Sequence, residues 1–213
     1  MPQHASTRGF PADVPRGFEP IETMARWTRW FLGLAPNEPL DAADIFERIH
    51  GRRLEVGKYV VSLETGVGDL PPAIEAQARF LPQLMTIEML LSVATYSQVL
   101  SRHARGLFSL CHELGHAVMH PKELMRLSRL PHATAAMLRA SADALPAYRD
   151  CEWQASAFAA AMIMPAVALE RLRVRSGELI VTEVQDRFGA SAPAATRRVR
   201  DFMNRRERLL AVS

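Results

Sequence analysis

The sequence predicts an α+β fold that is mostly helical, with a small β-sheet early in the chain. Three observations lead to this prediction. Apolar residues recur at helical spacing between Arg105 and His120. Two segments, 58–64 and 84–91, have the β-branched or alternating composition of strands. Helical patterns return in the last third of the chain, from about residue 150 onward.

The elements before the central helix follow from local signals. Apolar residues at helical spacing indicate a helix over 19–33. Asp41 is a good N-cap for a short helix that ends at Gly51. Residues 72–80 are compatible with a helix, whereas 95–104 form a polar stretch.

The second half of the chain is predicted to be helical. The Leu-, Ala- and Met-rich segment 122–146 should form one or two helices, and a helix from about Asp150 to Met164 should end at Pro165. Three further helices are expected at 166–175, 178–188 and 191–209.

The composition is that of an ordinary globular protein, with 48% hydrophobic and 23% charged residues. Residues 1–18 are rich in Pro, Gly and charge and have no apolar h-region, which predicts a mobile tail and no secretory signal. The longest mostly apolar run, 155–169, is broken by Ser156 and Pro165 and is too short to span a bilayer. We therefore expect a soluble, cytoplasmic protein with no membrane partner.

The net charge of +3 is unevenly distributed along the chain. Residues 171–213 contain ten arginines and five acids, a net of +5, so the remainder carries 3 − 5 = −2. Such a basic end is typical of a solvated helix face, and it is also compatible with binding to nucleic acid or to an acidic partner.

The motif HELGH at 112–116 is the main chemical signal. Residues four apart lie on one face of a helix, so His112 and His116 can bind one zinc ion without bending the backbone. Glu113 is rotated by one residue, close to the metal but not pointed directly at it. A general base that takes a proton from a metal-activated water would stand there.

Catalytic zinc usually has three protein ligands, so the third must come from another segment. Glu152 is the candidate, because Ala155, Ser156 and Ala159 on its helix face are small and would let two helices approach closely. Ser156 could hydrogen-bond a ligand histidine. His120 lies too far along its helix to be a ligand and is expected to support one or to end the helix. The alternative for Glu152 is an ordinary first-turn glutamate favoured by the helix dipole.

The two cysteines, Cys111 and Cys151, are too few for a disulfide framework and fit a reducing compartment. Each directly precedes a candidate ligand. We interpret them as small buried residues, and the alternative is a redox-sensitive pair beside the metal.

Two segments resemble the ImmA/IrrE family of metallopeptidases, RGLFSLCHELGHAVMH (105–120) and EWQASAFAAAMIMP (152–165). That family typically has a stretch like R…FTLAHELGHLLLH followed by E..AN.FAA.LLMP. FGASAPAATRRVRDF (188–202) is similar to its closing element, and the resemblance covers roughly 40–205. Three features depart from the family. Ser156 replaces the usual Asn or Asp, and Leu107 and Cys111 replace the usual Arg and Ala. The gap from His116 to Glu152 is 36 positions and is filled by an Ala- and Leu-rich helical insert.

The resemblance implies a gluzincin-like site with one zinc per chain, in which His112, His116 and Glu152 are ligands and Glu113 is the base. It also implies a minimal zincin-like domain, which we place at 19–175. A C-terminal helix-turn-helix-like element at 176–213 is expected to pack on this domain. Members of the family often cleave a helix-turn-helix repressor encoded nearby, so a transcriptional repressor is the expected protein substrate and the expected role is transcription regulation.

The expected peptide hydrolysis also needs a donor that steadies the oxyanion. The candidates are Tyr148, His132, His120 and His103. The substrate is expected to add as a strand along an edge formed by 84–91.

Two interpretations without catalysis stay open. The segment 178–205, with Gly189 at its turn, resembles a helix-turn-helix and could bind DNA or a repressor through its arginines. Alternatively, the protein keeps a structural zinc and binds a repressor without cutting it, in which case a fourth protein ligand would be expected.

Overall fold

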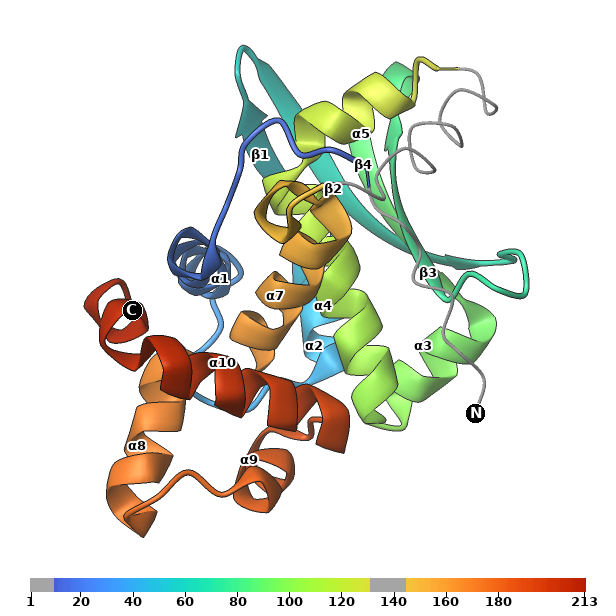
Figure 1. Cartoon of the computed structure of the whole chain (residues 1–213). Coiled ribbons are helices and arrows are strands. Elements are labelled where there is room, and N and C mark those ends of the chain that lie inside the picture. Colours follow the sequence, from blue (N-terminus) through green and yellow to red (C-terminus); the bar gives the residue numbers. More distant parts are fainter. Residues whose placement is uncertain (1–9, 131–144) are drawn as a thin grey trace.

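The computed structural model describes residues 10–130 and 145–213, and it confirms the predicted α+β architecture (Figure 1). Its layers are a sheet, the long helix α4 (Ala104–Met119) on one face of that sheet, and α7 (Cys151–Ile163) on the far side of α4. The helix α1 (Phe18–Phe31) covers α7 in turn. The other helices are α2 (Ala42–Ile49), α3 (Val93–Leu100), α5 (Pro121–Leu127), α8 (Ala166–Ser176), α9 (Val181–Phe188) and α10 (Ala192–Ala211), with short 3-10 turns at Pro82–Leu84 and Ala147–Arg149.

The sheet has four strands in the order β1-β2-β4-β3. Strands β1 (Arg52–Val56) and β2 (Tyr59–Gly68) form an antiparallel hairpin, and β2 pairs in parallel with β4 (Thr86–Ser92). Strand β3 (Ala76–Leu81) pairs antiparallel with β4 and forms one edge of the sheet.

Two predictions about this region are wrong. The segment 84–91 offers no edge to a substrate, because β4 lies between β2 and β3. Residues 72–80 contain most of a strand and no helix, since pairing with β4 overrides the helix-forming tendency of Ala, Gln and Arg. The polar stretch 95–104, for which no element was predicted, lies mostly in the helix α3, which follows the N-cap Ser92.

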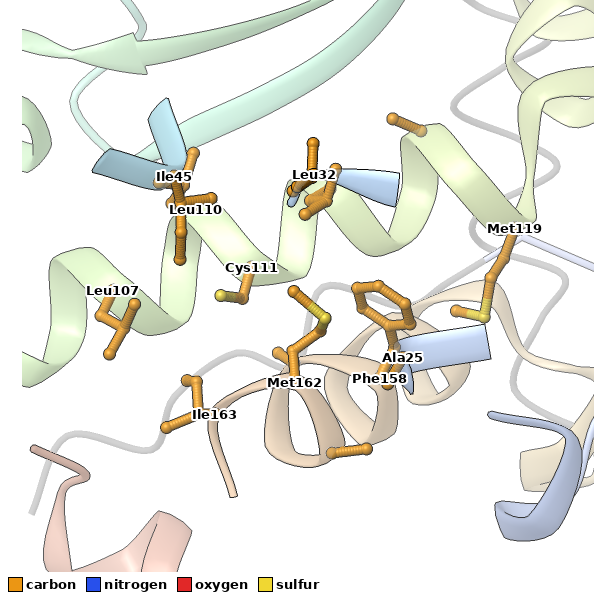
Figure 2. Packing of buried hydrophobic residues seen from close by; sticks show 14 of the residues in the cluster. Ala25, Leu32, Ile45, Leu107, Leu110, Cys111, Met119, Phe158, Met162 and Ile163 are labelled. Carbon is orange, nitrogen blue, oxygen red and sulfur yellow. The ribbon is translucent and has the colours of Figure 1, made fainter. Parts of the chain in front are cut away.

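The core forms where α4 and α7 cross, and Figure 2 shows Met162 and Phe158 of α7 directed toward α4. Leu110, Leu114 and Phe158 are fully buried there. Arg29 of α1 is also buried, and its guanidinium donates hydrogen bonds to the carbonyl of Met162 at the end of α7. These contacts fix the direction of α7 relative to α4, on which the site depends.

The prediction of a mobile tail at 1–18 is wrong for residues 10–18, the part that the structure describes. Residues 10–17 lie along the segment that leads into α7, Pro11 forms an antiparallel bridge with Asp150, and Phe10 is buried. Helix α1 begins at Phe18.

The C-terminal helices pack on the rest of the chain through buried groups. Arg198 of α10 forms a 2.6 Å ion pair with Glu22 of α1, and both side chains are almost fully buried. Gly189, with φ of 62°, ends α9 in the left-handed conformation that favours glycine. Seven of the ten arginines in 171–213 have an acidic partner within 4.0 Å.

Among the described residues, no single helix has the length and apolar character needed to cross a membrane. The pair α7 and α8 reaches that length only across a 50° bend.

Candidate metal centre

Two histidines of α4 and one glutamate of α7 converge on a single point. His112 and His116 lie one helical turn apart, and their Nε2 atoms are 3.1 Å from each other. Glu152, in the first turn of α7, places Oε2 3.1 Å from His112 Nε2 and Oε1 3.4 Å from His116 Nε2. Ligand-type atoms of all three residues lie within 4.8 Å of one another.

Small residues allow the two helices to approach closely enough for this convergence. A Cβ added to Gly115 would lie 3.0 Å from Phe158 Cδ1 and 3.2 Å from Ala155 Cα. The glycine inside α4 costs about 1 kcal/mol of helix stability relative to alanine. The close crossing supplies the reason for that cost.

The donor set fits a metal ion of the zinc type. Two imidazole nitrogens and one carboxylate are common zinc ligands, and three of them leave a coordination position for water or substrate. Burial alone would raise the pKa of the Glu152 carboxyl, but the neighbouring imidazoles of His112 and His116 hold that pKa well below its ordinary value. The carboxylate is therefore ionised at neutral pH and able to act as a ligand.

Further polar groups contact the Nδ1 atoms of the two imidazoles. Ser156 Oγ lies 3.3 Å from His112 Nδ1, and His120 Nδ1 lies 3.2 Å from His116 Nδ1. His120 is fully buried, and its Nε2 lies 3.0 Å from the side-chain oxygen of Gln154. Such partners orient ligand rings and set which ring nitrogen faces the metal.

The sequence of this region matches a known family. A model of the IrrE N-terminal-like domain of the M78 peptidases matches residues 98–200, which include α4, α7 and all the polar groups above. This stretch of the chain belongs to that family. No curated protein matches the chain.

Within the M78 domain, the side chain of Glu113 lies between α4 and the sheet. Its Oε2 accepts a 2.6 Å hydrogen bond from the backbone N–H of Ala78. Ala78 lies on the edge strand β3 and pairs with Met89 of β4. One carboxylate oxygen of Glu113 is therefore held by the strand, and the other remains for a proton.

The other predicted site residues are His103, Tyr148 and His132. His103 is the N-cap of α4, nine residues before His112, which at about 1.5 Å per residue is ~13 Å away and out of reach of a substrate at the metal. Tyr148 is half exposed just before α7, and its carbonyl oxygen accepts a hydrogen bond from Gln154. His132 lies outside the described residues.

The cysteines are both buried and free. Burial raises the pKa of the Cys111 thiol to about 12, and it also raises that of Cys151. Both thiols are thus protonated at neutral pH, which favours their interpretation as small buried residues over a reactive pair.

Sequence reasoning missed two groups that the structure brings to the site. The N–H of Ala78 gave no signal, because a backbone group acts through fold alone. Gln154 did carry a signal: it is a polar residue on a helix otherwise rich in alanine and apolar residues, where a buried polar group needs a partner.

Proposed function

We propose that this protein is a zinc-dependent endopeptidase, with one zinc per chain held by His112, His116 and Glu152. The observation that carries the proposal is the convergence of these three side chains in an M78 peptidase domain, with Glu113 directly after His112 in the sequence. A site that only stabilised the fold would need no glutamate at that position.

Zinc, when bound, supplies a Lewis acid that makes water nucleophilic near neutral pH and polarises a carbonyl group. The chain supplies the proton transfers. Glu113 accepts the proton of the attacking water and delivers it to the leaving amine, while the N–H of Ala78 keeps the carboxylate in place. Tyr148 remains a candidate donor to the oxyanion, because it is half exposed and lies four residues before Glu152 in the chain.

The substrate is proposed to add as an extended strand along β3. This strand is an edge of the sheet, and it is tied to the general base through Ala78. Main-chain hydrogen bonds with an edge strand bind a peptide with little dependence on its side chains. The scissile bond would then pass Glu113 and the three ligands.

The proposed substrate is a helix-turn-helix transcriptional repressor, whose cleavage would release transcription. This choice rests on the resemblance to the ImmA/IrrE family. The alternative of DNA binding through 178–205 is less favoured, because most arginines of 171–213 already have acidic partners and Arg198 is buried.

The test is incubation of the zinc-loaded protein with purified repressors encoded near it, followed by mass spectrometry of the products. Wild type should cut one of them at a defined bond. Glu113→Gln should retain zinc and cut slower by roughly 10²- to 10⁴-fold, the usual contribution of a general base. The matched control is Glu47→Gln, an exposed glutamate of α2, which should cut like wild type.

Two results would contradict parts of the proposal. Cleavage by Glu113→Gln at the wild-type rate would exclude Glu113 as the base. Tight binding of a repressor by the zinc-loaded wild type without any cleavage would favour the non-catalytic regulator.

A further inference from the structure

The segment before α1 lies across the entry to the helix that carries Glu152. We name residues 10–16 the N-terminal strap. It runs antiparallel to 148–151, as the dark-blue segment that passes over the start of α7 in Figure 1. Three backbone hydrogen bonds join the two segments: Cys151 N–H to Phe10 O at 3.1 Å, Ala12 N–H to Arg149 O at 2.8 Å and Arg16 N–H to Tyr148 O at 2.9 Å.

Side chains anchor the strap further at the metal centre. The ring of Phe10 is stacked against the imidazole of His116, with centroids 6.1 Å apart and an interplanar angle of 21°. Asp13 is held from both sides by α5, because its N–H donates to Glu123 at 2.8 Å and its carboxylate accepts from Arg126 at 2.9 Å. The strap lies outside the stretch 98–200 that matches the M78 family.

Gln154 connects the strap to the buried histidines. Its side-chain Nε2 donates to the carbonyl of Val14 at 3.1 Å and to that of Tyr148 at 2.9 Å. Because carbonyl groups only accept hydrogen bonds, these two contacts fix which end of the amide carries the oxygen. That oxygen must then accept from His120 Nε2, 3.0 Å away, and it also lies 3.4 Å from a guanidinium nitrogen of Arg16.

The direction of this bond determines the proton positions of two imidazoles. His120 carries its proton on Nε2, and it is neutral because it is fully buried. Its Nδ1 therefore presents a lone pair and can only accept from His116 Nδ1, 3.2 Å away. His116 consequently carries its proton on Nδ1 and presents the lone pair of Nε2 toward His112 and Glu152.

We propose that the N-terminal strap is part of the metal centre, and that through Gln154 and His120 it holds His116 in the tautomer that binds a metal. Gln154 is a positioning residue in this scheme and touches neither metal nor substrate. The inference rests on the proposed metal site, but the tautomer can be measured without metal.

The experiment uses the full-length, metal-free protein labelled with ¹⁵N at histidine, and zinc affinity measured by competition with a chelator. In Gln154→Met the acceptor for His120 is lost. The His116 resonances should then shift away from the single Nδ1–H form, and zinc should bind more weakly by roughly 10- to 100-fold, as for other residues that orient metal ligands.

The matched control is Gln98→Met. Gln98 is a glutamine of α3 whose buried side-chain oxygen has no hydrogen-bond partner among the described residues, so its replacement should change neither the His116 tautomer nor the zinc affinity. Wild-type tautomer and wild-type zinc affinity in Gln154→Met would overturn the inference. A wild-type protein that binds no zinc would instead overturn the proposed function, and the tautomer reading would still decide the role of Gln154.

Removal of residues 2–14 tests the strap itself. The truncation should weaken zinc binding in the wild-type background. In the Gln154→Met background it should weaken zinc binding further by less than about threefold, because the effects of residues that act through one network are not additive. Equal losses in both backgrounds would show that the strap does not act through Gln154. Should the truncated chain fail to fold by circular dichroism, Arg16→Met replaces it in the same comparison.

Discussion

The substitution Gly115→Ala tests whether the crossing of α4 and α7 sets the metal geometry. In an exposed helix this change would stabilise the protein by about 1 kcal/mol, because alanine favours helix over glycine. Here the added Cβ would lie 3.0 Å from Phe158 Cδ1, 3.2 Å from Ala155 Cα and 3.4 Å from Ala155 O. Carbon atoms prefer separations of about 3.5–4.0 Å, so the helices must move apart by roughly 0.5 Å.

Neither neighbour can move aside at low cost. Phe158 is fully buried in the core between the helices (Figure 2), and the Ala155 atoms belong to the backbone of α7. Overpacking of this kind usually costs about 1–3 kcal/mol, which exceeds the gain in helix propensity. We therefore expect a net loss of ~1 kcal/mol in unfolding free energy. Metal sites tolerate ligand displacements of only about 0.2 Å, so zinc affinity should fall by roughly tenfold or more.

The assay combines urea denaturation of the metal-free protein with zinc competition. Gly106→Ala is the matched control, because its Cβ would lie 2.8 Å from Val99 N and 2.9 Å from Gln98 C, at the junction of α3 and α4, and meets no atom of α7 among its nearest neighbours. It should destabilise the fold but leave zinc affinity unchanged. A Gly115→Ala protein that is more stable than wild type and binds zinc normally would show that the close crossing of α4 and α7 does not set the metal geometry.

Two other predictions concern buried polar groups. Arg198→Met should lower the unfolding free energy by about 3–5 kcal/mol, because it leaves the Glu22 carboxylate buried without its partner. The control Arg197→Met replaces an exposed arginine and should change the unfolding free energy little. Similar denaturation midpoints for the two variants would contradict this prediction. Burial, then the neighbouring His116, lowers the pKa of His120 from 6.5 to about 3. Between these values the unfolded chain binds a proton that the folded chain does not, so stability of the metal-free protein should fall on acidification by up to ~1.4 kcal/mol per pH unit. Removing this group in His120→Asn should flatten the pH dependence in that window, and an unchanged slope would show that His120 does not titrate in this way.

The parts of the fold predicted correctly are those with a strong local signal. Helices α4 and α7 follow from apolar or small residues at helical spacing. The N-cap of α2 is Asp41, as predicted, and its carboxylate accepts from the N–H groups of Ala43 and Asp44. In contrast, β3 has the composition of a helix and becomes a strand only because β4 offers a partner. The hairpin strand β1 gave no pattern long enough to predict it.

In the candidate site, too, the residues with a local sequence signal were predicted and those brought in by distant contacts were not. His112, Glu113 and His116 are adjacent in sequence, so one helix turn places them. Glu152 was named from its own helix face, and the structure brings it to the two histidines. The contacts of Phe10, Val14 and Ala78 could not be predicted, because each joins segments far apart in the chain through backbone or ring packing that leaves no sequence pattern.

The most direct measurement is the zinc content of the purified protein by mass spectrometry, for wild type and for Glu152→Gln, at the same free zinc concentration. Glutamine keeps the size of the side chain and removes only the charged ligand group. We expect about one zinc per wild-type chain and loss or marked weakening of zinc binding in the variant. Zinc absent from wild type, or bound equally by the variant, would contradict the three-residue metal centre.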